Sequence, residues 1–112
     1  MDTENNQQES AEVNVAKLSD EIQYQDSGIV SKQIIKKSNG NITLFAFDKS
    51  ESLTEHTSTF DAVAQVIEGE MEFTIGGKLY EVNGGEYINL PANIRHSLSA
   101  KEKTKMLLIM IR

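Results

Sequence analysis

Residues 68–85 read EGEMEFTIGGKLYEVNGG. In this stretch Met71, Phe73 and Ile75 alternate with polar residues, as they do in a strand with one buried and one solvated face. Gly76 and Gly77 follow at once, and such a pair favours a two-residue hairpin turn because both central positions need positive φ. The stretch therefore predicts a β-hairpin.

Similar segments recur on both sides of this hairpin, as short runs rich in Ile, Val, Phe, Thr and Tyr between Gly, Asn and Asp. About nine short strands with turns at regular intervals predict an all-β antiparallel barrel or sandwich. The expected strands are Ile29 to Lys36, Asn41 to Asp48, Leu53 to Thr57, Ala62 to Ile67, Glu70 to Ile75, Lys78 to Val82, Tyr87 to Leu90, Arg95 to Ser99 and Thr104 to Ile111.

The amino-terminal part differs from these strands. Residues 1–12 are acidic and contain almost no large apolar group, so we expect a disordered tail followed by one barrel domain over residues 13–112. Val13, Val15, Leu18 and Ile22 fit either a strand or one or two helical turns, and we favour a short helical segment from Ala16 to Ile22.

The formal net charge of the 112-residue chain is −6, of which the tail carries four negative charges, so the remainder is at about −2. A nearly balanced domain lacks the clustered cations that nucleic acid requires. We expect Lys36 with Lys37, and Lys101, Lys103 and Lys105, to be solvated groups at strand ends or loops. Nucleic acid is therefore not an expected partner.

The chain has no cysteine, which excludes disulfides and thiolate metal sites. Its longest apolar run, from Met106 to Ile111, is too short to cross a bilayer, and its amino terminus has no apolar signal region. We expect a cytoplasmic protein with no membrane partner.

Two spaced patterns make the chain similar to a known family. His56 and Gly69 match the first His and the closing Gly of GxxxxxHxHxxxExxxxxxG, while Gly85, Pro91 and His96 match GxxxxxPxGxxHxxxN. Over residues 40–112 the sequence thus resembles the small, single-domain cupins described as conserved-barrel proteins. The resemblance implies a double-stranded β-helix, or jelly-roll barrel, with a ligand pocket inside.

The resemblance also implies a metal site of three His and one Glu in the metal-dependent members, but here Ser58 replaces the second His and Ala62 the Glu. Only His56 and His96 remain as metal ligands, for a divalent transition ion such as Zn, Ni, Fe or Mn. Two imidazoles alone seldom retain an ion against water. The sequence therefore indicates a degenerate metal site and does not establish any cofactor.

The residues expected around the pocket share one face of their strands. If Ala62 points inward, alternation along its strand makes Ala64 and Val66 point inward as well. We expect these two residues to form an apolar floor beside His56, Ser58 and His96. Three hypotheses remain open: a binding module for a small molecule, a metal-dependent dioxygenase or isomerase on His56 and His96, and a dimeric interaction protein. The catalytic residues of the second stay unknown.

Two further expectations concern stability and assembly. In Asn41 to Asp48, Ile42, Leu44 and Ala46 lie on one face and Phe45 and Phe47 on the other, and Met106 to Ile111 has no polar face. Two strands that are apolar on both faces indicate a homodimer or a cover provided by the amino-terminal segment. At Gly69 we expect positive φ or a close backbone approach, so Gly69→Val should damage folding more than His96→Ala.

Overall fold

The structure is a computed structural model that describes residues 13–112, so the tail predicted for residues 1–12 lies outside the described residues. It contains one 3-10 turn and nine strands, each within one residue of a predicted strand at either end. These are η1 (Leu18–Asp20), β1 (Ile29–Lys37), β2 (Gly40–Phe47), β3 (Ser52–His56), β4 (Asp61–Glu68), β5 (Glu70–Ile75), β6 (Lys78–Asn83), β7 (Tyr87–Leu90), β8 (His96–Ala100) and β9 (Thr104–Ile111). The all-β prediction is confirmed.

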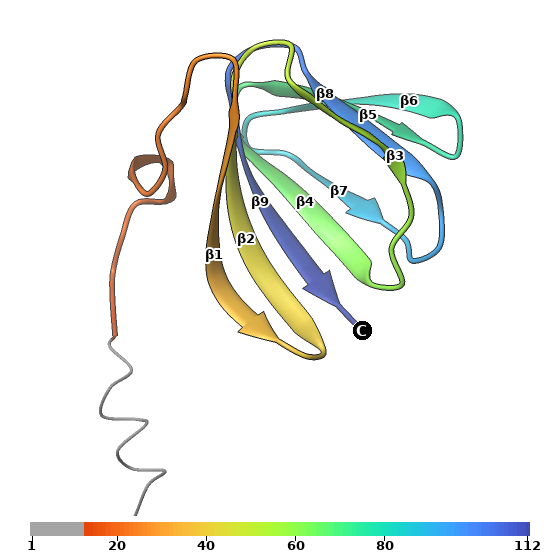
Figure 1. The fold of residues 1–112 in the computed structure, drawn as a ribbon, viewed down its shortest axis with the longest axis horizontal. Coiled ribbons are helices and arrows are strands. Elements are labelled where there is room, and N and C mark those ends of the chain that lie inside the picture. Colours follow the sequence, from red (N-terminus) through yellow and green to blue (C-terminus); the bar gives the residue numbers. More distant parts are fainter. Residues whose placement is uncertain (1–12) are drawn as a thin grey trace, which may run out of the picture.

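The strands form two antiparallel sheets that face each other (Figure 1). One sheet has the order β1-β2-β9-β4-β7 and the other the order β3-β8-β5-β6. β9 lies between β2 and β4; it pairs with β2 along its whole length and with β4 from Lys105 to Ile111. Because sequence neighbours such as β3 and β4 lie in different sheets, the chain crosses repeatedly between them, as a jelly roll requires.

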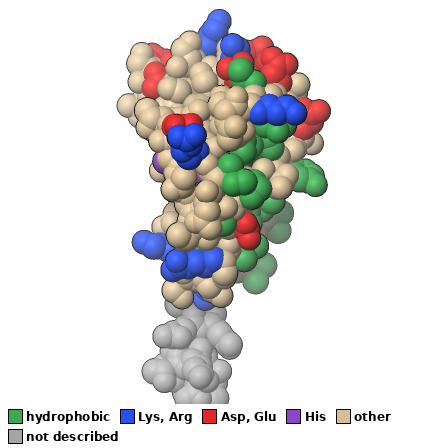
Figure 2. Space-filling model, turned by 90° about the vertical axis from the view of Figure 1, so that its right-hand side faces the viewer, with side chains coloured by type: hydrophobic (Ala, Val, Ile, Leu, Met, Phe, Trp, Pro, Cys, Tyr) green, Lys and Arg blue, Asp and Glu red, His purple; other side chains and the backbone are tan. Residues whose placement is uncertain are grey.

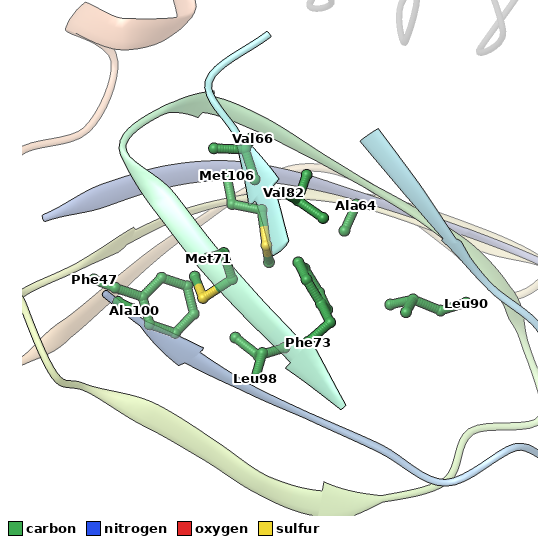
Figure 3. Packing of buried hydrophobic residues seen from close by; sticks show 10 residues of the cluster. All are labelled: Phe47, Ala64, Val66, Met71, Phe73, Val82, Leu90, Leu98, Ala100 and Met106. Atoms are coloured by element: carbon green, nitrogen blue, oxygen red, sulfur yellow. The ribbon is translucent and has the colours of Figure 1, made fainter. Parts of the chain in front are cut away.

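The predicted hairpin is confirmed, both in the conformation of its turn glycines and in the burial of its apolar residues. Gly76 and Gly77 have φ of 57° and 86°, and β5 pairs with β6 from Ile75↔Lys78 onward. Met71 and Phe73 are fully buried, as their alternation indicates. Figure 3 shows both side chains among the buried apolar groups of facing strands, including Phe47 and Met106. The two sheets are thus held together by an apolar core.

The amino-terminal segment (residues 13–28) differs from the expected helix. Its only helical part is the 3-10 turn Leu18–Asp20, preceded by extended backbone at Lys17 with no side-chain cap. Beyond the turn, Ile22 and Tyr24 reach the outer face of the larger sheet, where Ile22 packs with Leu44 and Ala46. A longer helix would turn one of these two side chains away from the sheet. The segment therefore covers part of the second apolar face of β2 and β9.

Lys105 also differs from its expected position, since its residue is only 6% exposed. Its ammonium group donates a hydrogen bond to the carbonyl of Ser19 and lies 5.0 Å from the centre of the Tyr24 ring. The cation is therefore satisfied by the amino-terminal segment that covers it and is not solvated at a strand end.

No helix within residues 13–112 has the length and apolar character needed to cross a membrane.

Candidate functional site

A cavity of about 280 Å³ lies between the two sheets at the end where β3 and β4 are joined. We call it the central cavity. Nine of its lining residues are apolar and only His56, Ser58 and His96 are polar, so one end of it carries all the polar groups. The residues around it are Phe45, Leu53, His56, Ser58, Phe60, Ala62, Leu90, His96, Leu98, Met106, Leu108 and Met110.

The two histidines come together through strand pairing. His56 ends β3, His96 begins β8, and the two are register partners in the antiparallel pair. Their ring centres are 4.4 Å apart with the planes at 66° to each other. His96 is buried, at 8% exposure, whereas His56 is exposed, and histidine atoms are visible at the surface in Figure 2. The pair therefore extends from the interior of the cavity to its mouth.

Each ring is fixed by a carbonyl of its own chain segment. The Nδ1 atom of His56 lies 2.7 Å from the carbonyl oxygen of Thr54, and that of His96 lies 3.1 Å from the carbonyl oxygen of Ile94. A carbonyl only accepts hydrogen bonds, so each Nδ1 must carry the proton that it donates. In the neutral rings Nε2 is then the acceptor, and this atom has no protein partner within hydrogen-bond distance in either residue over the part of the chain described.

Two loops hold this end of the cavity together. The Asn93 backbone N–H donates to the carbonyl of Ser58 at 2.7 Å, and the Ala92 N–H donates to a carboxylate oxygen of Asp61 at 2.9 Å. Asn93 adopts a left-handed conformation with φ of 67°, at the position where the family pattern has Gly. These bonds fix the turn before His96 against the turn after His56.

The structure brings together four of the six residues that the sequence placed in the pocket: His56, Ser58, Ala62 and His96. Ala64 and Val66 face inward, as the parity from Ala62 requires, but they are completely buried in the core and do not line the cavity. The sequence expectation was wrong for these two, because Phe73 and Met106 fill the interior at their level (Figure 3). The cavity is confined to one end of the jelly roll.

A transition-metal site in the family pattern does not fit these residues. Ser58 offers a hydroxyl that already accepts a hydrogen bond from the N–H of Phe60, and Ala62 offers no ligand. Within residues 13–112, no group of three or more His, Asp or Glu side chains is arranged to hold an ion. Glu55 points to the outer face of β3, where it lies 3.9 Å from Arg95. The chain supplies two imidazole donors, fewer than such ions usually take.

The sequence reasoning did not identify most of the apolar wall. Phe45, Met106, Leu108 and Met110 all come from the central strands β2 and β9, and Phe60 from the loop before β4. The sequence does contain one signal, since alternation along the strand puts Phe45 on the opposite face from Leu44. In a strand that is apolar on both faces, however, alternation does not say which face is inside.

Comparisons with known proteins agree with this arrangement. The family model for the cupin domain matches residues 43–112. A conserved protein of unknown function from Streptococcus pyogenes is 30% identical, with a TM-score of 0.87, over 91% of this chain and 90% of that one. A cupin 2 conserved barrel domain protein from Leptotrichia buccalis is 39% identical, with a TM-score of 0.82, over 84% of this chain and 46% of its own length.

A cupin superfamily protein from Desulfitobacterium hafniense shares the fold, with a TM-score of 0.84 and 22% identity, over 90% of this chain and 93% of that chain. No curated protein sequence matches. The family match covers more than half of the chain and includes both histidines of the central cavity. The chain therefore belongs to the cupin family.

Proposed function

We propose that this protein binds a small molecule in the central cavity and does so without a resident metal ion. The observation that supports the proposal is the cavity itself, about 280 Å³ of apolar space with polar groups at one end only. Binding sites for small molecules combine an apolar wall with a few orienting polar groups in this way. The replacement of two metal-ligand positions by Ser58 and Ala62 leaves the wall intact.

A metal-dependent enzyme is the second candidate, because each ring donates its Nδ1 proton to a carbonyl and keeps Nε2 free. Metal-ligating histidines are commonly oriented in this manner. Against it stands the absence of a third protein ligand among the described residues. Elemental analysis of the purified protein separates the two candidates: we expect far less than one metal ion per chain, and one ion per chain that is lost in both His56→Ala and His96→Ala would contradict the proposal.

Binding is tested by closing the cavity. Ala62→Leu adds three carbons to a cavity wall, and Thr59→Leu places the same leucine side chain on an exposed residue of the neighbouring loop that does not line the cavity. Propylbenzene is a suitable probe, with saturation-transfer NMR as the readout. We expect the wild type and Thr59→Leu to bind it and Ala62→Leu to lose binding. If the wild type binds neither propylbenzene nor any of its phenol, anisole and benzoate relatives, the proposed function is wrong.

The remaining hypothesis, an interaction protein whose dimer surface is its purpose, concerns the outer face of the larger sheet. The cavity is not explained by it, because an interaction module has no need for unfilled space in its core. For this reason we place ligand binding first.

A further inference from the structure

We infer that the central cavity selects an uncharged molecule with an apolar, aromatic body and one hydroxyl group, which donates its hydrogen bond to Nε2 of His56 or His96. The inference rests on the proposed function and adds the chemical class of the ligand. It depends on four features of the cavity: the direction of its hydrogen bonds, its lack of charge, its size and the nature of its wall.

The direction of hydrogen bonding follows from the two carbonyls behind the rings. Thr54 and Ile94 each hold an Nδ1–H, so in the neutral rings both Nε2 atoms offer lone pairs and neither offers a proton. A ligand that brings a donor to this end is matched, and one that brings only acceptors leaves the lone pairs without partners. Ser58 adds a hydroxyl that can donate to the oxygen of the same ligand group, since its oxygen already accepts from the N–H of Phe60.

The lack of charge excludes the ionic alternatives. Among residues 13–112, no Asp, Glu, Lys or Arg lines the cavity. An ammonium group would find no carboxylate there, and a carboxylate would find no guanidinium or ammonium, so either ion would lose its hydration without a counter-charge. The guanidinium of Arg112 lies 4.6 Å from the centre of the Phe60 ring, but Arg112 does not line the cavity.

Size and wall define the apolar part of the ligand. A cavity of roughly 150 Å³ takes benzene, so about 280 Å³ has room for one ring and a short substituent, on the order of ten non-hydrogen atoms. The wall offers the rings of Phe45 and Phe60 and the thioethers of Met106 and Met110. Aromatic edges and faces pack well against both kinds of group. These contacts favour a substituted aromatic ring over a flexible chain.

The test compares four probes of matched shape at pH 8: 4-propylphenol, which donates; 4-propylanisole, which only accepts; propylbenzene, which does neither; and 4-propylbenzoate, which is charged. Dissociation constants are measured by titration calorimetry. We expect 4-propylphenol to bind about tenfold more tightly than 4-propylanisole, the difference that one matched hydrogen bond provides, and 4-propylbenzoate to bind most weakly.

The rings are tested by His56→Phe and His96→Phe, which keep an aromatic group in place and remove the acceptor. At least one of them should reduce the preference for 4-propylphenol over 4-propylanisole to about one, while propylbenzene binding stays within about threefold of the wild type. A merely structural role would weaken all three probes together. Leu79→Phe, on an exposed residue of β6, serves as the control and should leave the preference unchanged.

Two outcomes overturn the inference and leave the proposed function standing. If 4-propylphenol, 4-propylanisole and propylbenzene bind equally, the cavity binds by apolar contact alone. If 4-propylbenzoate binds most tightly, with affinity that rises as the pH falls, the histidines act as cations and not as acceptors. Failure of every probe to bind contradicts the proposed function itself.

Discussion

Among the seven glycines, Gly69 has the least room for a side chain. Its φ is 97°, and a Cβ placed there would lie 2.3 Å from the carbonyl oxygen of Lys103 and 2.6 Å from the hydroxyl of Thr104. Thr104 is fully buried, and its hydroxyl accepts the Glu70 N–H at 3.1 Å while its single proton lies within reach of the carbonyls of Glu102, at 2.8 Å, and Glu70, at 3.1 Å. The β4–β5 turn is therefore fitted against the start of β9, and both reasons expected for this glycine are present.

Gly69→Val should cost about 3 kcal/mol or more, because a β-branched residue is strained at positive φ and also collides with backbone. His96→Ala removes a ring from the wall of a cavity and should cost about 1 kcal/mol. Thermal melting of the two variants checks this. We expect a loss of more than about 10 °C for Gly69→Val and roughly 4 °C for His96→Ala, and equal losses would show that the turn is not the stricter position.

At the same scale, the sequence predicted which residues would share a site better than it predicted their depth. His56 and His96 could be paired from motif spacing, because that spacing reflects strand register. Ala64 and Val66 could be given a side by alternation but not a depth, since depth depends on how far Phe73 and Met106 extend from other strands. Alternation shows only on which face of a strand a side chain lies. The depth of that side chain depends on how residues of several other strands pack around it.

Among the elements, the amino-terminal segment is held to the larger sheet by polar contacts as well as by Ile22. The Tyr24 hydroxyl donates to a carboxylate oxygen of Glu68 at 2.7 Å, and Lys32 pairs with Glu21 at 3.0 Å. Burial, followed by the hydrogen bond to Glu68 and its negative charge, raises the pKa of Tyr24 well above its usual range. Tyr24 therefore stays protonated in the folded protein at pH values where a free tyrosine ionises.

Tyr24→Phe should cost about 1 kcal/mol at neutral pH through the lost hydrogen bond. Because the pKa is raised on folding, the contribution of Tyr24 is complete below its unfolded pKa of about 10 and declines as the pH rises towards the folded pKa. The difference in urea stability between wild type and Tyr24→Phe should therefore shrink from about pH 9 to pH 11. Tyr87→Phe, at an exposed tyrosine, is the control, and a constant Tyr24→Phe difference would contradict the prediction.

This element was the least predictable from sequence. Leu18 and Ile22 are compatible with helical spacing, and only the position of the sheet decides that Ile22 and Tyr24 must both reach it. Lys105 was misplaced for the same reason: its burial depends on the Ser19 carbonyl and the Tyr24 ring, which lie more than eighty residues away in the sequence. The strands could be predicted because their side chains alternate regularly. The conformation of the amino-terminal segment could not, because it pairs with no strand and depends on the surface that it covers.

On the scale of the whole molecule, the amino-terminal segment covers only part of the outer face of the larger sheet. Beyond it, Ile35, Ile42, Ile109 and Val63 are successive cross-strand neighbours on β1, β2, β9 and β4. We call these four residues the isoleucine row. Two shallow hollows flank it and share Ile109 and Ile111, which is 60% exposed. Such a continuous apolar row on a surface indicates an interface.

We propose that a second copy of this chain covers the isoleucine row. It continues directly from the buried outer cluster of Leu44 and Ala46, and two copies related by a twofold axis would each present the same row to the other. Residues 1–12 contain Met1 as their only large apolar residue, so their sequence offers no complementary surface. A homodimer is therefore the expected state in solution.

Ile35→Lys tests the dimer, because Ile35 lies on an edge strand and is 46% exposed, so the change should leave folding intact. Sedimentation equilibrium should show a dimer for the wild type and a shift to monomer for Ile35→Lys. Leu79→Lys places the same charge on the other sheet, at a residue that is 58% exposed, and should remain dimeric. A monomeric wild type, or an unchanged mass for Ile35→Lys, would refute the proposal.

The place of β9 in the larger sheet has a consequence for the way this protein is made in the cell. β2 and β4 do not pair with each other, and each pairs with β9. The ribosome synthesises β9 more than fifty residues after β2. Until it emerges, the apolar faces of two growing half-sheets remain open to solvent, the condition under which nascent chains associate wrongly. Chains halted before Thr104 should therefore aggregate or be degraded, whereas those that pass it can complete the sheet in one step.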